Sequence, residues 1–359
     1  MIKELNIREI NLQRINFAWI LVISLIIFGA IPILINWGKA INYPFVFDYG
    51  EGPLFNQAIL LSSGKEIYQE TWEDYPFTMT NYPPLFVIIY SLIGKFFELS
   101  IPLGRFITAF AAFSSAILLG LIIKTLTHDN FSSILGTLLL FVSPIFVLWS
   151  KFVRVDILAL SLSLAGIFIA IRWRSKNWSP ILSALFLICA IYTKQTFLLA
   201  APLALFGWHY FQVRNNIFRF ISTLVIGSLF LLILLFVVTN GGFINHTFFG
   251  NQNQFSLVQS IAYLLDLFMT LPIILGIVIL EIIFILKQKK RELYFTIFYL
   301  IGSFGSALAI GKIGAGVNYL LEFLTAICLL TGVALYRWSL PSNQKFGKTL
   351  IFLLWSYAR

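Results

Sequence analysis

Charged residues are scarce in this chain of 359 residues. They make up 11% of it, whereas 59% of the residues are hydrophobic and the mean hydropathy is +0.89. A water-soluble domain is about 25% charged and about half apolar, so a single globular core could not bury this much apolar surface. The composition therefore excludes a soluble globular protein and predicts an all-α, polytopic membrane protein.

Cysteine and histidine are also rare. The two cysteines, Cys189 and Cys328, lie inside apolar runs, which argues against a disulfide framework or a cysteine-based metal site. The three histidines, His128, His209 and His246, are too far apart in the sequence to suggest a metal cluster. We therefore expect no metal centre built from these residues.

Apolar runs long enough to cross a bilayer recur along the whole chain. A transmembrane helix needs about 20 mostly apolar residues, at a rise of about 1.5 Å each. We expect ten to eleven spans. The ten complete ones are 17–38, 106–126, 131–149, 157–171, 180–193, 196–211, 217–239, 264–286, 294–311 and 317–335. An eleventh begins near Thr349 and is cut off at Arg359, so we expect the chain to be truncated at its C-terminus.

The segment 83–94 decides the topology, because it is apolar but short and begins with two prolines. If it does not span, the side that holds the N-terminus carries 16 Lys and Arg residues and the opposite side carries 8. If it spans, all later loops change sides and this excess is lost. Because cytoplasmic loops are enriched in Lys and Arg, we predict that the segment does not cross the membrane and that the N-terminus is cytoplasmic. The same asymmetry explains the net charge of +10 without a nucleic-acid partner.

This topology places the polar residues that need an explanation on one face of the membrane. The outer segments are 39–106, 150–156, 192–196, 239–263 and 311–318. A secondary transporter would instead carry ionisable groups near the bilayer midplane, on broken helices in two similar halves. The sequence has neither an internal repeat nor a midplane charge pair.

The first outer loop contains the acidic motif Asp48-Tyr49-Gly50-Glu51. Pro53 after it and Gly64 further on predict a short helix between them. Asp48 and Glu51 would lie just before its N-terminus, where the helix dipole favours carboxylates. Helix capping alone would also account for this pair.

Three further charged residues lie in outer turns. Arg154 and Asp156 are two residues apart at a helix start, so they do not share a face and each should have another partner. Lys194 lies at the tip of a hairpin whose apolar arms, 180–193 and 196–211, are shorter than the hydrocarbon core. The tip should dip below the membrane surface, where a cation needs an anion. Capping by the aspartate and snorkelling of the cations toward water are the alternatives.

Two other outer loops carry polar groups that suit a ligand. The turn 311–319 is glycine-rich and contains Lys312, so its backbone N–H groups could hold an anion. It lacks the Walker spacing and does not follow a soluble strand, which argues against a nucleotide site. The segments 245–247 and 251–254 offer amides and hydroxyls that suit sugar hydroxyls but are equally ordinary in a loop.

The order of these features resembles the GT-C membrane glycosyltransferases, the group that includes protein O-mannosyltransferases, aminoarabinose transferases and the RgtA/B/C/D-like sugar transferases. The resemblance covers about residues 17–211. It rests on the Asp48–Glu51 motif, on Gly64 and Tyr68, on Tyr82 before Pro83 and Pro84, and on the turns at Arg154 and Lys194. Aminoarabinose transferases have a lysine directly before the two prolines, where this chain has Tyr82.

The resemblance implies a GT-C-like fold with a juxtamembrane helical first outer loop. It implies a catalytic module at 1–211, including the outer loop 39–105, followed by further transmembrane helices at 212–359. It also implies transfer of a sugar from a polyprenyl-phosphate donor to a glycan, lipid or protein acceptor, on the outer face of the cell's inner membrane. The implied catalytic residues are Asp48 and Glu51, and the implied substrate-binding residues are Arg154, Asp156, Lys194, Gln195 and Tyr82.

The chemistry of such a transfer suits these residue types. One carboxylate, here Asp48, suffices to take the proton of an attacking hydroxyl. The departing phosphate needs no general acid, but its growing charge is stabilised by Arg or Lys in a poorly solvated pocket. A single displacement would invert the anomeric carbon. We expect no cofactor, although a divalent metal would be compatible with the carboxylates.

Two other functions fit the same residues. A transporter or flippase for a lipid-linked or anionic solute would use Arg154 and Lys194 but would not need Asp48. A noncatalytic membrane subunit would need none of the three.

Overall fold

The computed structural model describes residue 24 and the ranges 28–71, 73 and 78–339. This part of the chain is helical, apart from turns and a single isolated bridge between Phe255 and Lys312. The all-α prediction is therefore confirmed. The eleventh predicted span, from Thr349, lies outside the described residues.

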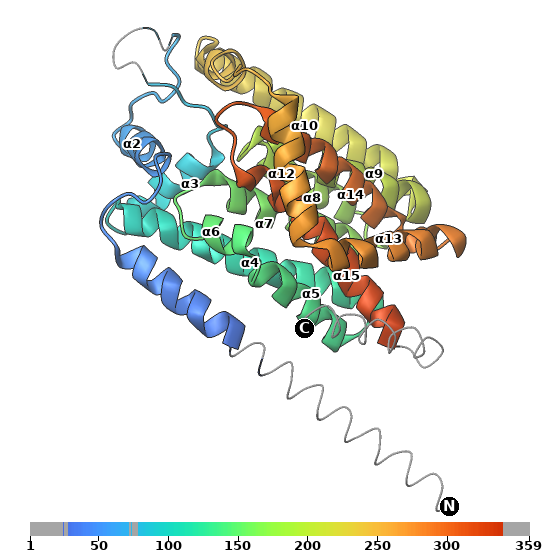
Figure 1. Ribbon diagram of the computed structural model, residues 1–359. Coiled ribbons are helices and arrows are strands. Elements are labelled where there is room, and N and C mark those ends of the chain that lie inside the picture. Colours follow the sequence, from blue (N-terminus) through green and yellow to red (C-terminus); the bar gives the residue numbers. More distant parts are fainter. Residues whose placement is uncertain (1–23, 25–27, 72, 74–77, 340–359) are drawn as a thin grey trace, which may run out of the picture.

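The helices follow one another closely along the chain (Figure 1). A helix at 28–42 comes first. The α-helices after it are α2 (Glu51–Ser62), α3 (Leu85–Gly94), α4 (Ile101–Thr127), α5 (Asn130–Phe141), α6 (Pro144–Trp149), α7 (Val155–Arg172), α8 (Ser179–Ile191), α9 (Ala200–Gln212), α10 (Ile217–Val238), α11 (Gly242–Ile244), α12 (Leu257–Thr270), α13 (Pro272–Lys287), α14 (Tyr294–Ala307) and α15 (Leu321–Ser339). Short 3₁₀ helices are η1 (Gln195–Leu198), η2 (Arg214–Asn216), η4 (Arg291–Leu293), η5 (Leu308–Gly311) and η6 (Val317–Leu320), and η3 (Asn245–Phe249) is a π-helix.

Five of the described helical segments are long and apolar enough to cross a membrane, or six if the bent pair α12 and α13 counts as one span. The chain is thus a multi-pass membrane protein, but the predicted count of ten to eleven spans is not confirmed. Two predicted spans are broken at prolines, which lack the N–H that a continuous helix needs. The run 131–149 divides into α5 and α6 before Pro144, and 264–286 bends by 91° before Pro272.

The loop that the sequence analysis assigned to the outer side contains helices, as expected. Helix α2 begins at Glu51, two residues before Pro53, and Gly64 follows its end with a left-handed φ of 72°. Helix α3 has ten residues, which at about 1.5 Å each is far too short to cross the hydrocarbon core. The prediction that 83–94 does not span is consistent with this length.

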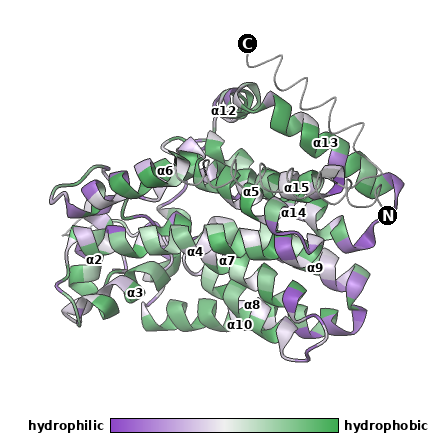
Figure 2. Cartoon of the chain, turned by 90° about the horizontal axis from the view of Figure 1, so that it is seen from below, coloured by the Kyte–Doolittle hydropathy of each residue, from purple (hydrophilic) through white to green (hydrophobic). Residues whose placement is uncertain are grey.

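The core forms where α4, α5, α7, α9, α14 and α15 pack together. Close helix contact depends on small residues. At Gly166 of α7, for example, an added Cβ would lie 2.8 Å from a methyl of Leu187 in α8. Helix α10 is different, because its most apolar window has no buried residues. Figure 2 shows hydropathic colouring along the bundle, with hydrophilic residues concentrated toward its two ends.

The predicted outer segments meet at one end of the bundle, around α2, α3 and α6. Thr80 of the first loop donates its N–H to Nδ1 of His246 at 3.0 Å. The side-chain amides of Gln195 and Asn251 both donate to the carbonyl of Asn81, at 3.0 and 3.5 Å. Segments more than 100 residues apart in the sequence are therefore joined by hydrogen bonds at this end.

Candidate functional site

A cavity of about 600 Å³ opens between these outer segments. Its volume lies within the range of about 300 to 1,000 Å³ that is usual for small-molecule sites. The lining is mostly polar and comes from the first loop, the α6–α7 turn, the loop after η3 and the turn between η5 and η6. The residues are Asp48, Tyr49, Asn81, Tyr82, Trp149, Arg154, Asn251, Asn253, Lys312, Ile313, Gly314, Ala315, Gly316, Asn318 and Tyr319.

Asp48 and Arg154, both in the cavity wall, form an ion pair. Arg154 is 4% exposed and its guanidinium lies against the rings of Tyr49 and Trp149. The side chain of Asp48 remains 16% exposed, and its Oδ2 also accepts the N–H of Gly50 at 2.9 Å. The carboxylate is therefore held in place on one side while it remains open to the cavity.

Gly50 is required by this arrangement. A Cβ at this position would overlap the guanidinium of Arg154, whereas a Cβ at Gly52 would meet nothing within 4 Å. The end of an arginine side chain can normally move aside, but here Asp48 fixes it. Any larger residue at position 50 would have to displace the cation from its carboxylate partner.

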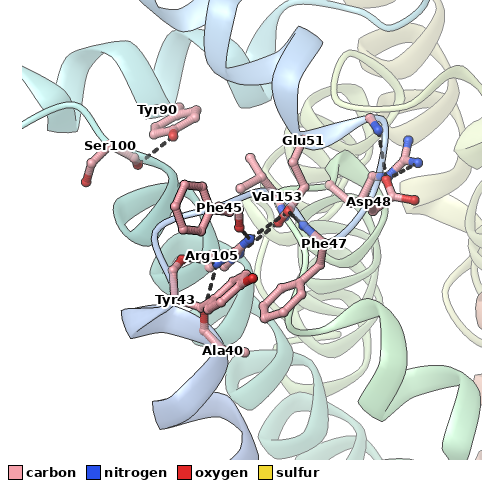
Figure 3. A network of polar contacts seen from close by, with 12 residues as sticks. Ala40, Tyr43, Phe45, Phe47, Asp48, Glu51, Tyr90, Ser100, Arg105 and Val153 are labelled. Carbon is pink, nitrogen blue, oxygen red and sulfur yellow. Dashed lines mark hydrogen bonds and ion pairs between the residues drawn. The ribbon is translucent and has the colours of Figure 1, made fainter.

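Glu51 does not line the cavity and is completely buried. Figure 3 shows its carboxylate among the groups that bind it, beside Arg105 and Val153. Its two carboxylate oxygens accept from Nε and an Nη of Arg105, at 2.9 and 2.7 Å. They also accept the backbone N–H groups of Phe47 and Val153, at 2.7 and 2.9 Å. Burial alone would raise the pKa of Glu51, but these hydrogen bonds hold it below its ordinary value.

Arg105, in the first turns of α4, is likewise completely buried. Its remaining N–H groups donate to the carbonyl oxygens of Ala40, Tyr43 and Phe45, at 2.5 to 2.8 Å. Together with Glu51 it holds the segment before Asp48 against the turn that carries Arg154. The structure thus places Glu51 behind the cavity rather than in its lining.

Asp156 and Lys194 form a second ion pair, in which both side chains are almost fully buried. Oδ1 of Asp156 also accepts a hydrogen bond from Nδ2 of Asn318 at 2.8 Å, and Nζ of Lys194 lies 4.3 Å from the ring centroid of Tyr319. Asn318 and Tyr319 line the cavity, whereas the ion pair does not. Burial alone would lower the pKa of Lys194, but the carboxylate raises it above its ordinary value.

Of the two remaining predicted residues, Tyr82 lines the cavity and Gln195 does not. The carbonyl of Tyr82 accepts the hydroxyl of Tyr68 at 2.6 Å, and burial raises the pKa of Tyr82 to about 12. Gln195 donates to the carbonyl of Asn81. Within the described part of the chain, no group of three His, Cys, Asp or Glu side chains is placed to hold a metal ion.

Sequence reasoning placed Arg105 and Asn318 in outer segments but did not single out either residue as part of the site. An arginine among the apolar residues that open a long helix was a usable signal, because such residues are costly and need a partner. No comparable signal in the sequence marked Asn318, because its hydrogen bond to Asp156 joins two positions that are 162 residues apart. As expected, Arg154 and Asp156 have different partners, and Lys194 has an anion.

Comparisons with known proteins found similarity in structure. Neither a protein-family model nor a curated sequence matches the chain. Its fold matches the crystal structure of ArnT from Cupriavidus metallidurans in the apo state, with a TM-score of 0.68 and 13% identity, over 93% of this chain and 63% of that one. The structure of the same protein bound to undecaprenyl phosphate matches with a TM-score of 0.63 and 16% identity, over 93% and 64%.

The chain therefore spans less than two thirds of the length of the ArnT structures that it matches. The fold expected from the sequence resemblance is thereby confirmed, and over nearly its whole length the chain has the GT-C fold of these two structures.

Proposed function

We propose that the chain is a membrane glycosyltransferase that transfers a sugar from a polyprenyl-phosphate donor to an acceptor hydroxyl. The observation that carries this proposal is the pairing of Asp48 with Arg154 in the wall of one large polar cavity, in a chain with the GT-C fold. A matching fold bound to undecaprenyl phosphate supports the donor class. The acceptor is a glycan, a lipid or a protein.

The reaction needs one proton acceptor and a stabilised leaving group. The acceptor oxygen forms a bond to the anomeric carbon while the bond from that carbon to the phosphate oxygen breaks. The acceptor proton passes to the carboxylate of Asp48, and the electron pair of the broken bond leaves with the phosphate. Attack opposite the leaving group inverts the anomeric carbon. Arg154 orients Asp48, and the ion pair of Asp156 and Lys194 supports the wall that carries Asn318 and Tyr319.

A second cavity, of about 390 Å³, provides a place for apolar chain next to the polar one. The two share the segment 316–320, because Gly316, Asn318 and Tyr319 line the polar cavity while Val317 and Leu320 line the apolar one. Most of its other lining residues are also apolar. A lipid phosphate with its head in the first cavity could therefore lay part of its tail in the second.

The charge distribution supports a proposal for the side on which the cavity lies. The cavity lies among the segments that hold the smaller share of Lys and Arg, which supports a site on the extracytoplasmic face of the inner membrane and a cytoplasmic N-terminus. A donor whose tail stays in the bilayer reaches such a site without leaving the membrane.

The test is the isosteric change Asp48→Asn in the purified protein, assayed for sugar transfer from a polyprenyl-phosphate donor. An amide cannot take the acceptor proton, so we expect transfer to fall by at least about 100-fold, the lower end of what a positioned base contributes. Glu70→Gln, an exposed carboxylate in the same loop, should retain full transfer. Unchanged transfer in a correctly folded Asp48→Asn variant would reject the assignment of the base.

The alternative of a transporter or flippase has its own outcome. Reconstituted vesicles that move a lipid-linked or anionic solute across the membrane, with no covalent product, would replace the proposal by that function. In that case Asp48→Asn would leave the movement intact.

A further inference from the structure

A third cation enters the polar cavity from the turn between η5 and η6. Lys312 is half-buried and lines the cavity, and its Nζ donates to Oδ1 of Asn251 at 2.6 Å. Among the residues that the structure describes, no carboxylate forms an ion pair with it. Its position in the wall therefore rests on a neutral amide.

The turn that carries Lys312 is firmly attached to the neighbouring loop. Ile313 donates its N–H to the carbonyl of Gln254 at 2.8 Å, and Ser256 donates its N–H to the carbonyl of Gly311 at 2.7 Å. The side-chain amide of Asn253 donates to the carbonyl of Ile313 at 2.8 Å. The backbone on both sides of the cation is thus held in place, and Lys312 is positioned before any ligand arrives.

The charges around the cavity do not balance. In its lining, Asp48 neutralises Arg154, and no carboxylate of the lining remains to neutralise the ammonium of Lys312. Behind the wall, Asp156 neutralises Lys194. The pKa values reflect the difference, because burial lowers the pKa of Lys312 whereas the carboxylate raises that of Lys194. The described lining therefore carries one uncompensated positive charge in a partly desolvated place, which favours an anionic ligand.

We propose that Lys312 binds the phosphate group of the lipid-linked donor and retains it when it becomes the leaving group. This inference rests on the proposed function and gives the phosphate a specific partner. Binding at Lys312 replaces a hydrogen bond to the amide of Asn251 by a charge-assisted one to a phosphate oxygen. Binding at Arg154 instead would bring the phosphate beside the carboxylate of Asp48, where the two negative charges repel each other.

The same assignment gives the leaving phosphate and the acceptor hydroxyl separate partners, Lys312 and Asp48. Transfer turns a phosphodiester with one negative charge into a phosphomonoester that carries up to two near neutral pH. The ammonium of Lys312 would receive the added charge, while Arg154 keeps Asp48 oriented toward the acceptor. Because the product carries more charge than the donor, removal of Lys312 should weaken binding of the product more than binding of the donor.

The test compares binding of farnesyl phosphate and of farnesol to the full chain in nanodiscs, by titration calorimetry. Farnesyl phosphate has the phosphomonoester of the product on a short isoprenoid, and farnesol has the same isoprenoid without charge. Lys312→Gln should weaken farnesyl phosphate by about 10- to 100-fold and leave farnesol unchanged, since a hydrogen bond to a charged group is lost. Lys312→Arg should restore most of the affinity. Lys65→Gln, an exposed lysine of the first loop, is the matched control.

Each result has one meaning. If Lys312→Gln binds farnesyl phosphate as tightly as the unmodified chain does, or weakens farnesol equally, the role of Lys312 is overturned while the proposed function stands. If the unmodified chain binds farnesyl phosphate no better than farnesol, the lipid-phosphate donor itself is rejected, and this inference with it. If inorganic phosphate alone displaces farnesyl phosphate at similar concentration, the site takes a free anion rather than a lipid headgroup, and the inference fails.

Discussion

Replacing Glu51 by Gln tests whether the buried pair with Arg105 holds the first loop in place. The two carboxylate oxygens together accept four N–H groups, two from Arg105 and two from the backbone of Phe47 and Val153. Glutamine has one acceptor oxygen, so one N–H of the guanidinium and one backbone N–H would face an NH₂ group instead. The charge of Arg105, which is fully buried, would also lose its counterion.

Removal of one partner from a buried ion pair costs about 3 to 5 kcal/mol. That is a large part of the roughly 5 to 15 kcal/mol by which native proteins are stable. We therefore expect Glu51→Gln to lower the free energy of unfolding by at least about 3 kcal/mol, measured by denaturant titration in mixed micelles. Glu70→Gln, the exposed carboxylate of the same loop, should change it by less than about 0.5 kcal/mol.

A double-mutant cycle separates the ion pair from the other contacts of Arg105. Arg105→Met also leaves three carbonyl oxygens, those of Ala40, Tyr43 and Phe45, without a donor. The double variant should nevertheless be less destabilised than the sum of the two single variants, because neither charge is then left alone. A cost below about 1 kcal/mol for Glu51→Gln, or strict additivity in the cycle, would refute the reasoning.

Two further predictions concern the neighbouring loops. Gly50→Ala should reduce sugar transfer by at least about 10-fold, because the new Cβ displaces Arg154 from Asp48. Gly52→Ala is the control and should not reduce transfer, because a Cβ at this position meets nothing within 4 Å. Equal activity of the two variants in the transfer assay would contradict the predicted clash. Burial lowers the pKa of His246 below its ordinary value of 6.5, so the unfolded chain takes up the proton before the folded one does. The contribution of the neutral ring, which accepts the N–H of Thr80, to the free energy of unfolding is complete above pH 6.5 and is lost as the pH falls from there toward the lowered folded pKa. Denaturant titrations between pH 7 and 5 should therefore show a decline in stability that His246→Gln reduces, and an equal slope in both proteins would show that a group other than His246 causes the decline.

The general form of the site could be predicted from sequence because it follows from topology. Once the Lys and Arg count assigned a side to each loop, the acidic motif, Arg154 and Lys194 had to lie on one face. For each cation the sequence predicted that the partner is an anion, but it did not predict which residue supplies that anion. The actual pairs, Asp48 with Arg154 and Asp156 with Lys194, depend on helix packing that no local pattern encodes.

Part of the difference between the predicted spans and the helices of the structure has a local cause. Hydropathy measures how apolar a run is, but it does not register whether the backbone continues through it. The runs that contain Pro144 and Pro272 are mostly apolar, and yet the missing N–H divides each of them. Glu51 illustrates a different limit, because a carboxylate next to a helix start looks the same in sequence whether it faces a cavity or a buried arginine.

The hairpin of α8 and α9 has a consequence for the surrounding membrane. Each of these helices has 13 residues, or about 20 Å of length, against a hydrocarbon layer of about 30 Å. Lipids next to this hairpin must shorten or tilt their acyl chains to match it, at a cost that grows with bilayer thickness. The chain should therefore favour thin membranes, and long saturated lipids should oppose its insertion through hydrophobic mismatch.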